Sequence, residues 1–300
     1  MIDEFSRRYF IFFILMGKAL FFNVASAFFN VILVVVIKLM VNDSMITPEI
    51  ASFFRHISAL IIILPFILIT LRRDPRHFVE NAPQWVMILR AVCFTMGTFL
   101  WPIVFTHMPM HIAMTIGFLA PFISNILLVV FLKEKIPRHV WIAKIVATVG
   151  VVVILEPYIH DFNRYYLLAV VCVMFWGIAS TLNKLIAQRK VRINISLYYV
   201  TIYSVIFTGM IVYFGKIEFP KNLVEPVLYL GLLSVASQYF SMKAYQVSKG
   251  YLVNAMEFVR FLMYLVMDIV VFGADIKMLT IVGAIIIGAS VYSVVKRHEY

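Results

Sequence analysis

Long apolar runs, interrupted by short polar or Pro- and Gly-containing breaks, make up almost the whole of this chain. A helix needs roughly 20 mostly apolar residues to cross the hydrocarbon core of a bilayer. The connections between the runs are short, and no stretch has the composition of a soluble domain or a low-complexity linker. The pattern predicts an all-α integral membrane protein with ten transmembrane helices, over residues 17–40, 50–71, 84–106, 111–132, 138–156, 164–187, 194–215, 225–247, 251–273 and 277–296.

The composition agrees with a protein that crosses the membrane many times. Of the 300 residues, 63% are hydrophobic and 14% are charged, and the mean hydropathy is +0.96. A soluble domain is about 45–50% apolar and about 25% charged. Cys93 and Cys172 are too few for a disulfide framework, and no Cys/His group has metal-ligand spacing. We therefore expect the lipid bilayer as a partner, and neither a metal nor a cofactor.

Lysines and arginines are distributed unevenly between the predicted connections. If the N-terminus is cytoplasmic, fourteen of them fall in cytoplasmic segments and four in outside segments. This bias follows the positive-inside rule, and it accounts for a pI near 9.6 without a nucleic-acid partner. An even number of spans returns the C-terminus to the cytoplasm. Arg7, Arg8 and the Ala-Ser-Ala of residues 25–27 resemble a signal peptide, but Lys18 interrupts the apolar run, so we expect an uncleaved first span.

The chain contains a weak internal repeat. The stretch VVIKLMVNDSMITPEIASFF resembles TLNKLIAQRKVRINISLYYV, and this alignment places Lys38 over Lys184. Further along, TFLWPIVFTHMPMHIAMTIGF resembles QYFSMKAYQVSKGYLVNAMEF, with Phe105 over Tyr245. The two matches occur in the same order in both parts of the chain, which indicates a duplicated unit.

The repeat divides the chain into residues 1–156 and 157–300, with five predicted spans in each block. Because five is odd, the second block enters the membrane in the opposite direction. Two inverted halves with a substrate site between them, near the midplane, are a recurrent architecture of transporters. The two halves can then exchange conformations, which moves the opening from one side to the other. Inverted repeats also occur in channels, so a channel is an alternative.

The stretch APFISNILLVVFLKEKIPRHVWIAKIVATVGVVVI, residues 120–154, resembles the central signature of the EamA type of the drug/metabolite transporter superfamily. That signature has a proline early in span four and a glutamate at its cytoplasmic end. In the next span it has a tryptophan or similar residue and a glycine that lets helices pack. A lysine at the end of span one and the Phe54-Arg55 pair of span two fit the same family. The residues of this chain that match the signature are Pro121, Glu134, Trp141 and Gly150.

The nearest likeness is to the S-adenosylmethionine uptake branch, on the stretches LLAVVCVMFWGIASTLNKLIAQRK and SMKAYQVSKGYLVNAMEFVRFLMYLVMDIVVF. The resemblance implies a secondary transporter of the bacterial inner membrane that moves a small polar metabolite, with an S-adenosylmethionine-like substrate favoured. The second half departs from the pattern, with Phe261 at the position of Pro121 and Gly-Ala-Asp at 273–275 in place of a Leu-Lys-Glu ending. Export of amino acids or drug-like compounds, which other family members perform, is therefore the alternative.

Glu257 and Arg260 are opposite charges three residues apart within an apolar run. At this spacing both side chains lie on one face of a helix. An ionised group near the middle of a span costs several kcal/mol unless it is paired or hydrated. The pair is either a structural ion pair or part of a water-filled cavity that binds a polar ligand, and both roles can coexist. The aligned residues of the first half, Gly117 and Ala120, carry no charge.

Other side chains are weaker candidates for the substrate site. Tyr239 and Lys243 share one helical face, and Lys243 is expected at a depth where it can meet Glu257 or reach the bilayer surface. Asp268 is a candidate proton-coupling carboxylate or a structural partner of Lys277 or another group at the outer end. The remaining candidates are aromatic rings that would suit a cation and amides that need a partner in hydrocarbon, namely Trp101, Trp176, Asn30 and Asn254.

Four further polar residues have local predictions. Lys38 and Arg90 lie near span ends and could extend to the bilayer surface. His107 and His111 flank a predicted outside turn, where exposed histidines usually have no functional role. None of the four is predicted to line the substrate site.

Enzyme activity is not expected. Glu257 and Asp268 are eleven residues apart, which is about 16 Å along a helix and too far for shared acid–base chemistry. The chain has no P-loop, nucleophile elbow or HExxH motif. Without an ATP-binding motif, transport must use an ion gradient, a counter-transported solute or proton, or the gradient of the small-molecule substrate itself.

Overall fold

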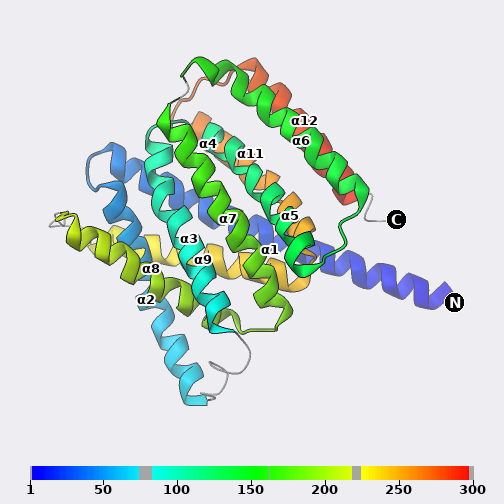
Figure 1. Cartoon of the computed structure of the whole chain (residues 1–300), viewed down its shortest axis with the longest axis horizontal. Helices are drawn as coiled ribbons and strands as arrows, with labels where there is room; N and C mark the ends of the chain where they lie inside the picture. Colours follow the sequence, from blue (N-terminus) through cyan, green and yellow to red (C-terminus); the bar gives the residue numbers. More distant parts are fainter. Residues whose placement is uncertain (1, 74–82, 162, 218–223, 297–300) are drawn as a thin grey trace.

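The computed structural model describes residues 2–73, 83–161, 163–217 and 224–296, and these residues form helices joined by short connections (Figure 1). Two of the predicted spans each consist of two consecutive helices, so the helices match the ten predicted segments. In chain order the helices are α1 (Ile2–Asn42), α2 (Pro48–Arg73), α3 (Gln84–Thr106), α4 (Met110–Gly117), α5 (Leu119–Leu132), α6 (Arg138–Leu155), the 3-10 helix η2 (Glu156–Asp161), α7 (Arg164–Gln188), α8 (Ile193–Phe214), α9 (Val224–Val247), α10 (Gly250–Ala255), α11 (Phe258–Val270) and α12 (Met278–Lys296).

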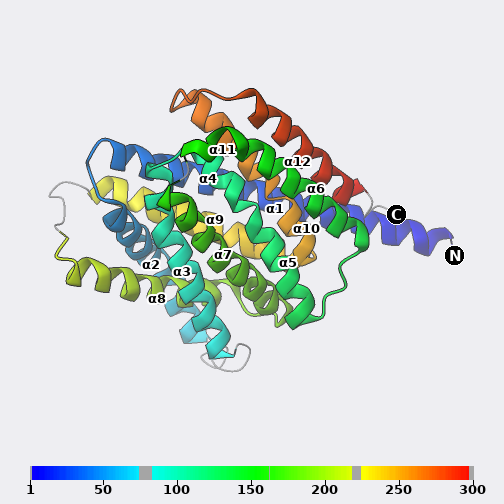
Figure 2. The same ribbon diagram turned by 45° about the horizontal axis from the view of Figure 1, so that its top comes forward.

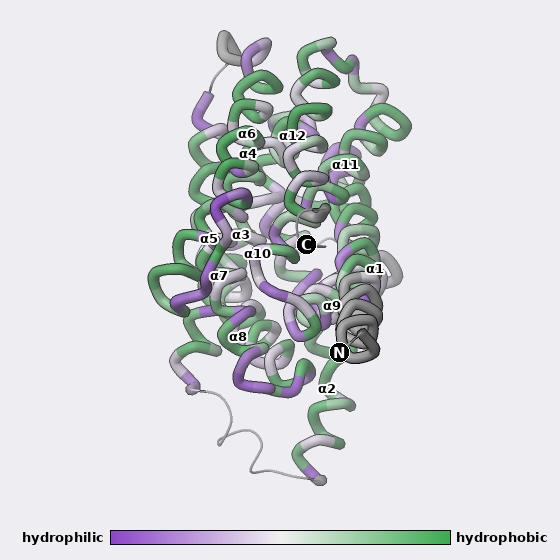
Figure 3. The backbone as a smooth tube through the Cα atoms, turned by 90° about the vertical axis from the view of Figure 1, so that its right-hand side faces the viewer, coloured by the Kyte–Doolittle hydropathy of each residue, from purple (hydrophilic) through white to green (hydrophobic). Residues whose placement is uncertain are grey.

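The described residues contain seven helical segments that are long and apolar enough to cross a membrane. The last helix is a shorter apolar segment, Met278–Val294, and α10 and α11 are each too short to cross alone. Helix α9 is not among the seven segments. It contains polar residues that line the interior cavity, including Ser237, Gln238 and Ser241. Along the helices the colouring is mainly hydrophobic, and hydrophilic colour gathers near the connections (Figure 3).

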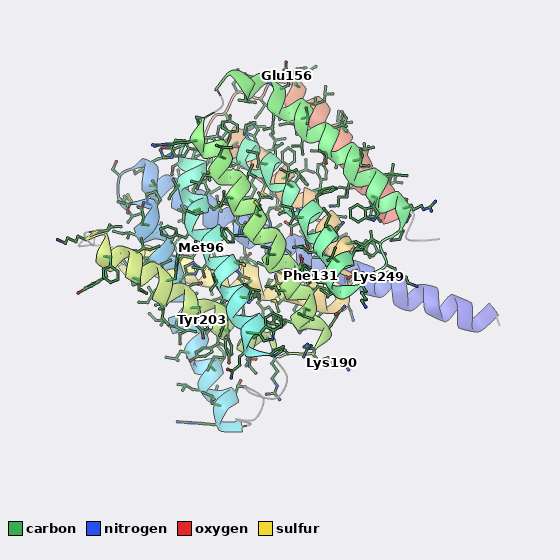
Figure 4. All side chains as sticks on the ribbon, viewed as in Figure 1. Met96, Phe131, Glu156, Lys190, Tyr203 and Lys249 are labelled. Atoms are coloured by element: carbon green, nitrogen blue, oxygen red, sulfur yellow. The ribbon has the colours of Figure 1, made fainter. Side chains whose placement is uncertain are left out.

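Large apolar side chains lie on the outside of the helices, as a lipid-facing surface requires. Phe131, Tyr213 and Met278 are each more than 70% exposed. Glu156, before α7, lies at the top of the view, and Lys190, after α7, lies toward the bottom (Figure 4). The helices therefore present apolar surface between two polar ends, which is the fold class predicted from the sequence.

The helices pack in a pattern that is nearly the same when the two halves are exchanged. The first helix of the first half, α1, packs on α9, the third helix of the second half. Conversely, the first helix of the second half, α7, packs on α3, the third helix of the first half. Helices α2 and α8, which occupy the second place in each half, contact each other. The last helices of the two halves, α6 and α12, lie side by side at one edge of the molecule (Figures 1 and 2).

A glycine contact brings α6 and α12 together. A Cβ added at Gly150 would lie 2.9 Å from the carbonyl oxygen of Gly283, and a Cβ at Gly283 would lie 2.6 Å from that of Gly150. Neither position can accept a larger side chain without separating the helices. Small residues permit this close approach between helices in a membrane, where van der Waals packing drives association. The sequence interpretation of Gly150 as a packing glycine agrees with this contact.

The fourth and ninth predicted spans are both interrupted. Helix α4 ends at Gly117, and Phe118 makes the transition to α5. Helix α10 ends at Ala255, and residues 256–257 make the transition to α11. Pro121 lies in the first turn of α5, where its missing N–H is tolerated. In the repeat alignment the two breaks fall within one residue of each other, which places two irregular backbones at matching positions of the two halves.

Candidate substrate cavity

A cavity of about 130 Å³ lies where the two interrupted spans meet the helices around them. Helices α1 to α5 of the first half and α7, α9, α10 and α11 of the second contribute to its wall. Near the breaks the lining residues are Met114, Gly117, Phe118, Ala120, Pro121, Asn254, Glu257, Arg260 and Tyr264. Discontinuous helices at the interface of two halves are a common setting for substrate sites in secondary transporters.

The Glu257–Arg260 pair is formed and lies in this wall. Arg260 Nη1 is 2.8 Å from Glu257 Oε2, and the two side chains are 19% and 17% exposed. Glu257 is the last residue before α11, so the break places its carboxylate beside the first turn of that helix. The Nε of Arg260 has no hydrogen-bond partner in the structure. The pair is therefore an ion pair in the cavity wall, and it leaves one buried donor of Arg260 unpaired.

Two indole rings form an aromatic part of the wall. The ring centroids of Trp101 and Trp176 are 4.5 Å apart, with an interplanar angle of 59°. Gly97 provides the space for this arrangement, because a Cβ at that position would lie 2.5 Å from Trp176 Nε1. Both predicted tryptophans thus line the cavity, on α3 and α7. They present π-surface to a flat or cationic ligand.

The two predicted asparagines also line the cavity, each with a hydrogen-bond partner. Tyr264 donates from its hydroxyl to Asn30 Oδ1 at 2.9 Å, which connects α11 with α1. Asn254 donates from Nδ2 to Asn125 Oδ1 at 2.9 Å and accepts from the hydroxyl of Tyr245 at 3.0 Å. These bonds satisfy amides that would otherwise be costly inside a membrane. They also fix α10 relative to α5 and α9.

Tyr239 and Lys243 lie elsewhere. They share one face of α9 as predicted, with Lys243 Nζ 5.7 Å from the centroid of the Tyr239 ring. That face lines a separate, open groove beside the connection between α7 and α8, together with Lys190 and Arg192. Lys243 therefore does not lie beside Glu257 as expected, because a different face of α9 lines the cavity.

Asp268 is partnered by His111, another group at the predicted outer end, and not by Lys277. Its Oδ2 accepts hydrogen bonds from the backbone N–H of His111 at 2.6 Å and lies 2.7 Å from His111 Nδ1. Both side chains are 1% exposed. The expected partner, Lys277, instead donates to the carbonyl oxygen of Pro157. The expectation that His111 is an exposed turn residue is wrong, because this contact joins the start of α4 to α11 in the interior; His107 is exposed as expected.

Lys38 and Arg90 are buried rather than extended to the bilayer surface. Arg90 is 1% exposed and donates to Asn183, Ser196, Gln238 and Met242. Lys38 is 8% exposed, and its Nζ donates to the carbonyl oxygen of Met108 at 3.4 Å. Other helices supply the acceptors of Arg90, and the connection between α3 and α4 supplies that of Lys38. The position of a residue within its own span does not reveal such partners.

The aligned lysines of the two halves make equivalent contacts. Lys38 reaches Met108 in the connection between α3 and α4. Lys184 donates to the carbonyl oxygen of Ser248, between α9 and α10, at 2.6 Å. Met108 and Ser248 are themselves aligned in the repeat. Each lysine thus bonds the turn that precedes an interrupted span, at matching places in the two inverted halves.

Sequence reasoning gave Arg55 no role at the site. Its side chain lines the cavity from α2 and is 4% exposed. Its Nε donates to Ser234 Oγ at 3.0 Å. A charge within an apolar run was the signal that selected Arg260, and the same signal applies to Arg55. The other lining residues without a predicted site role include Ser26, Phe94, Thr98, Ser180, Ser237, Gln238, Ser241, Tyr245 and Tyr264.

The cavity wall has the composition of a small-molecule binding site. Among the described residues, no three His, Cys, Asp or Glu side chains form a group that could hold a metal ion. The wall instead combines an ion pair, an additional guanidinium, amides, hydroxyls and aromatic rings. A few oriented polar groups among apolar and aromatic surface are typical of small-molecule sites.

Comparison with known proteins gives both a family and individual relatives. The EamA-like transporter family matches residues 17–156 and again residues 163–296. The S-adenosylmethionine uptake transporter of Rickettsia felis is 29% identical over 160 residues, which cover 53% of this chain and 51% of that protein. The riboflavin transporter of Brucella anthropi is 22% identical over 253 residues, covering 82% of this chain and 88% of that protein. The match thus spans about half the length of the Rickettsia relative.

One solved crystal structure has the same fold as this chain. It superposes with a TM-score of 0.62 at 14% identity, over 91% of this chain and 96% of that one. At this identity the likeness concerns the fold alone. The likeness extends over nearly all of both chains.

Proposed function

The chain belongs to the EamA-like transporter family, and from this premise we propose that it is a secondary transporter that moves a small polar metabolite by alternating access. The observation that carries the proposal is the cavity between the interrupted spans, which combines lining residues from both halves. The two halves, residues 1–156 and 157–300, act as the inverted repeats that exchange conformations. Glu257 and Arg260 orient the charged groups of the substrate, and Trp101 and Trp176 contact its flat or apolar part.

The volume of the cavity supports a cycle with more than one conformation. Pockets that bury drug-sized ligands measure roughly 300–1,000 Å³, whereas this cavity measures about 130 Å³. A metabolite of that size therefore requires the cavity to widen before it binds. Separation of the halves on one side at a time would supply both the space and the route of entry.

An S-adenosylmethionine-like metabolite is the favoured substrate. The Rickettsia relative is named as an S-adenosylmethionine uptake transporter and the Brucella relative as a riboflavin transporter. Both names describe uptake or transport of a heterocyclic metabolite that carries polar groups. Export of amino acids or drug-like compounds is the alternative within the same family. The uneven distribution of lysines and arginines supports a bacterial inner membrane location with both termini in the cytoplasm.

Transport by purified protein in liposomes tests the proposal. Radiolabelled S-adenosylmethionine, riboflavin and a panel of amino acids would be offered to ATP-free vesicles, with an imposed proton gradient or a counter-solute inside. We expect accumulation of at least one metabolite above protein-free vesicles. Movement that occurs only when ATP is present would contradict a secondary transporter, and ion-like conductance without saturation would favour a channel.

A further inference from the structure

Three buried or partly buried arginines surround the centre of the molecule, and their partners differ. Arg90 is satisfied by acceptors from other helices, as described above. Arg260 is paired with Glu257. Arg55 makes one hydrogen bond, from Nε to Ser234. Its two terminal nitrogens have no acceptor, and no carboxylate forms an ion pair with it, among the residues that the structure describes. Of the two arginines in the cavity wall, Arg55 is thus the one without a carboxylate partner among the described residues, and both of its terminal nitrogens are free to donate.

An isolated cation at this depth is costly. A buried charge requires a partner or water because the low-dielectric interior removes its hydration. Arg55 is 4% exposed, and the ring of Phe94, centred 6.0 Å from its guanidinium carbon, contributes only a weak cation–π contact. Its hydrogen-bond partner Ser234, and Thr98 and Tyr264 in the same wall, carry no fixed negative charge. The wall therefore has a free site for an anion.

The geometry of a guanidinium specifies the kind of anion. The guanidinium is planar, and its parallel N–H groups can bind both oxygens of one carboxylate. It also keeps its positive charge at physiological pH. The charged residues of the cavity wall are Arg55, Arg260 and Glu257, so two positive charges face one negative charge. Since Glu257 partly neutralises Arg260, the excess positive charge belongs to Arg55.

We propose that Arg55 is the carboxylate subsite of the cavity, and that the transported metabolite carries an α-amino-acid end whose carboxylate binds Arg55. This inference rests on the proposed function and adds the substrate class to it. The amine of the same end binds near Glu257, and a ring or other flat group lies against Trp101 and Trp176. S-adenosylmethionine has a carboxylate, an amine and a flat heterocycle, whereas riboflavin has the heterocycle without a carboxylate.

Matched ligand pairs test the subsite. One pair is S-adenosylmethionine and its decarboxylated form, and a second is tryptophan and tryptamine; the members of each pair differ only by the carboxylate. Binding to the full-length purified protein would be measured for each member, with riboflavin as a carboxylate-free probe. A charge-assisted bidentate contact predicts that the wild type binds the carboxylate member of at least one pair roughly 10- to 100-fold more tightly.

Variants then connect that preference to Arg55. Arg55→Gln is expected to reduce the preference to about twofold or less, while Arg55→Lys retains part of it because the charge remains. Ser234→Ala removes the protein partner of Arg55 and is the structural control; it should keep the preference. Folding of each variant is checked by monodispersity and thermal unfolding in detergent. If Arg55→Gln does not fold, the comparison of Arg55→Lys with Ser234→Ala still decides the question.

The outcomes separate the two proposals. If the wild type binds decarboxylated ligands as tightly as their parents, or if it binds only riboflavin, the carboxylate subsite is wrong although the transporter remains. A folded Arg55→Gln variant with an unchanged preference also overturns the subsite. If no probe binds or moves in liposomes, the proposed function fails, and the inference fails with it.

Discussion

The two interrupted spans break at matching backbone positions, but they line the cavity with different kinds of side chain. At the first break the cavity wall consists of Gly117, Phe118, Ala120 and Pro121. At the second, the aligned region provides Asn254, Glu257, Arg260 and Tyr264. A break between two consecutive helices therefore exists in both halves, but only the second half adds charged side chains. The comparison suggests that duplicated halves preserve the shape that movement requires, while one half becomes specialised for the ligand.

The two breaks also differ in how they are anchored. The start of α4 is tied to α11 by the buried contact between His111 and Asp268. Helix α10 is instead tied to α5 and α9 by neutral amide and hydroxyl bonds through Asn254. When one partner of a buried polar contact is removed, the other is left without an acceptor or donor away from water, which is costly. We therefore expect the first break to depend on a single contact more strongly than the second.

The largest expected effect is at Asp268. Asp268→Ala leaves the backbone N–H and the ring of His111 without their acceptor inside the protein. The expected loss is about 3–5 kcal/mol in the free energy of unfolding. Chemical or thermal unfolding in a mild detergent would measure it. Asp275→Ala is the matched control, since Asp275 is exposed on the segment after α11; equal stability of the two variants would show that the contact anchors nothing.

The next effect concerns the charges that distinguish the second break. Glu257→Gln, Arg260→Gln and the reversed double variant Glu257→Arg/Arg260→Glu would be compared in folded yield and in affinity for the transported metabolite. The reversed pair can form again, so it should fold. It should nevertheless bind roughly 10- to 100-fold more weakly, because the ligand meets the two charges in the wrong order.

Recovery of affinity is the informative outcome for this pair. If the reversed variant binds as tightly as the wild type, the two charges serve only to hold the helix. The binding site would then depend on Trp101, Trp176 and Arg55. A variant in which only Arg260 is changed also leaves Glu257 without its partner, so its folded yield must be measured beside its affinity.

The smallest effect tests the aligned lysines, which contact aligned turns in the two halves. Lys184→Met removes a hydrogen bond of 2.6 Å to Ser248, and Lys38→Met removes one of 3.4 Å to Met108. Hydrogen bonds of charged groups contribute about 1.5–3 kcal/mol, and the shorter bond should contribute more. We expect Lys184→Met to open the cavity toward the side of the α9–α10 connection, and Lys38→Met toward the opposite side.

Thiol labelling measures that opening. A cysteine at Ser180, which lines the cavity, would be introduced into a chain in which Cys93 and Cys172 are replaced by serine. Each lysine variant should increase labelling of this cysteine from its own side of the membrane only. An increase from both sides with either variant would indicate general loosening and not control of one entrance.

The sequence alone determined the number and limits of the spans, because bilayer thickness requires long apolar segments and each length is a local property. It also showed the duplication, the close-packing Gly150 and the Glu257–Arg260 pair, whose spacing of three residues places both on one helical face.

Only the tertiary structure decided which face of each helix meets the cavity. Tyr239 and Lys243 share a face that faces away from it, while Arg55 faces it. The partners of Asp268, Arg90 and Lys38 come from distant segments. Helical periodicity defines the faces of one helix, but the rotation of that helix against its neighbours depends on packing across the whole molecule.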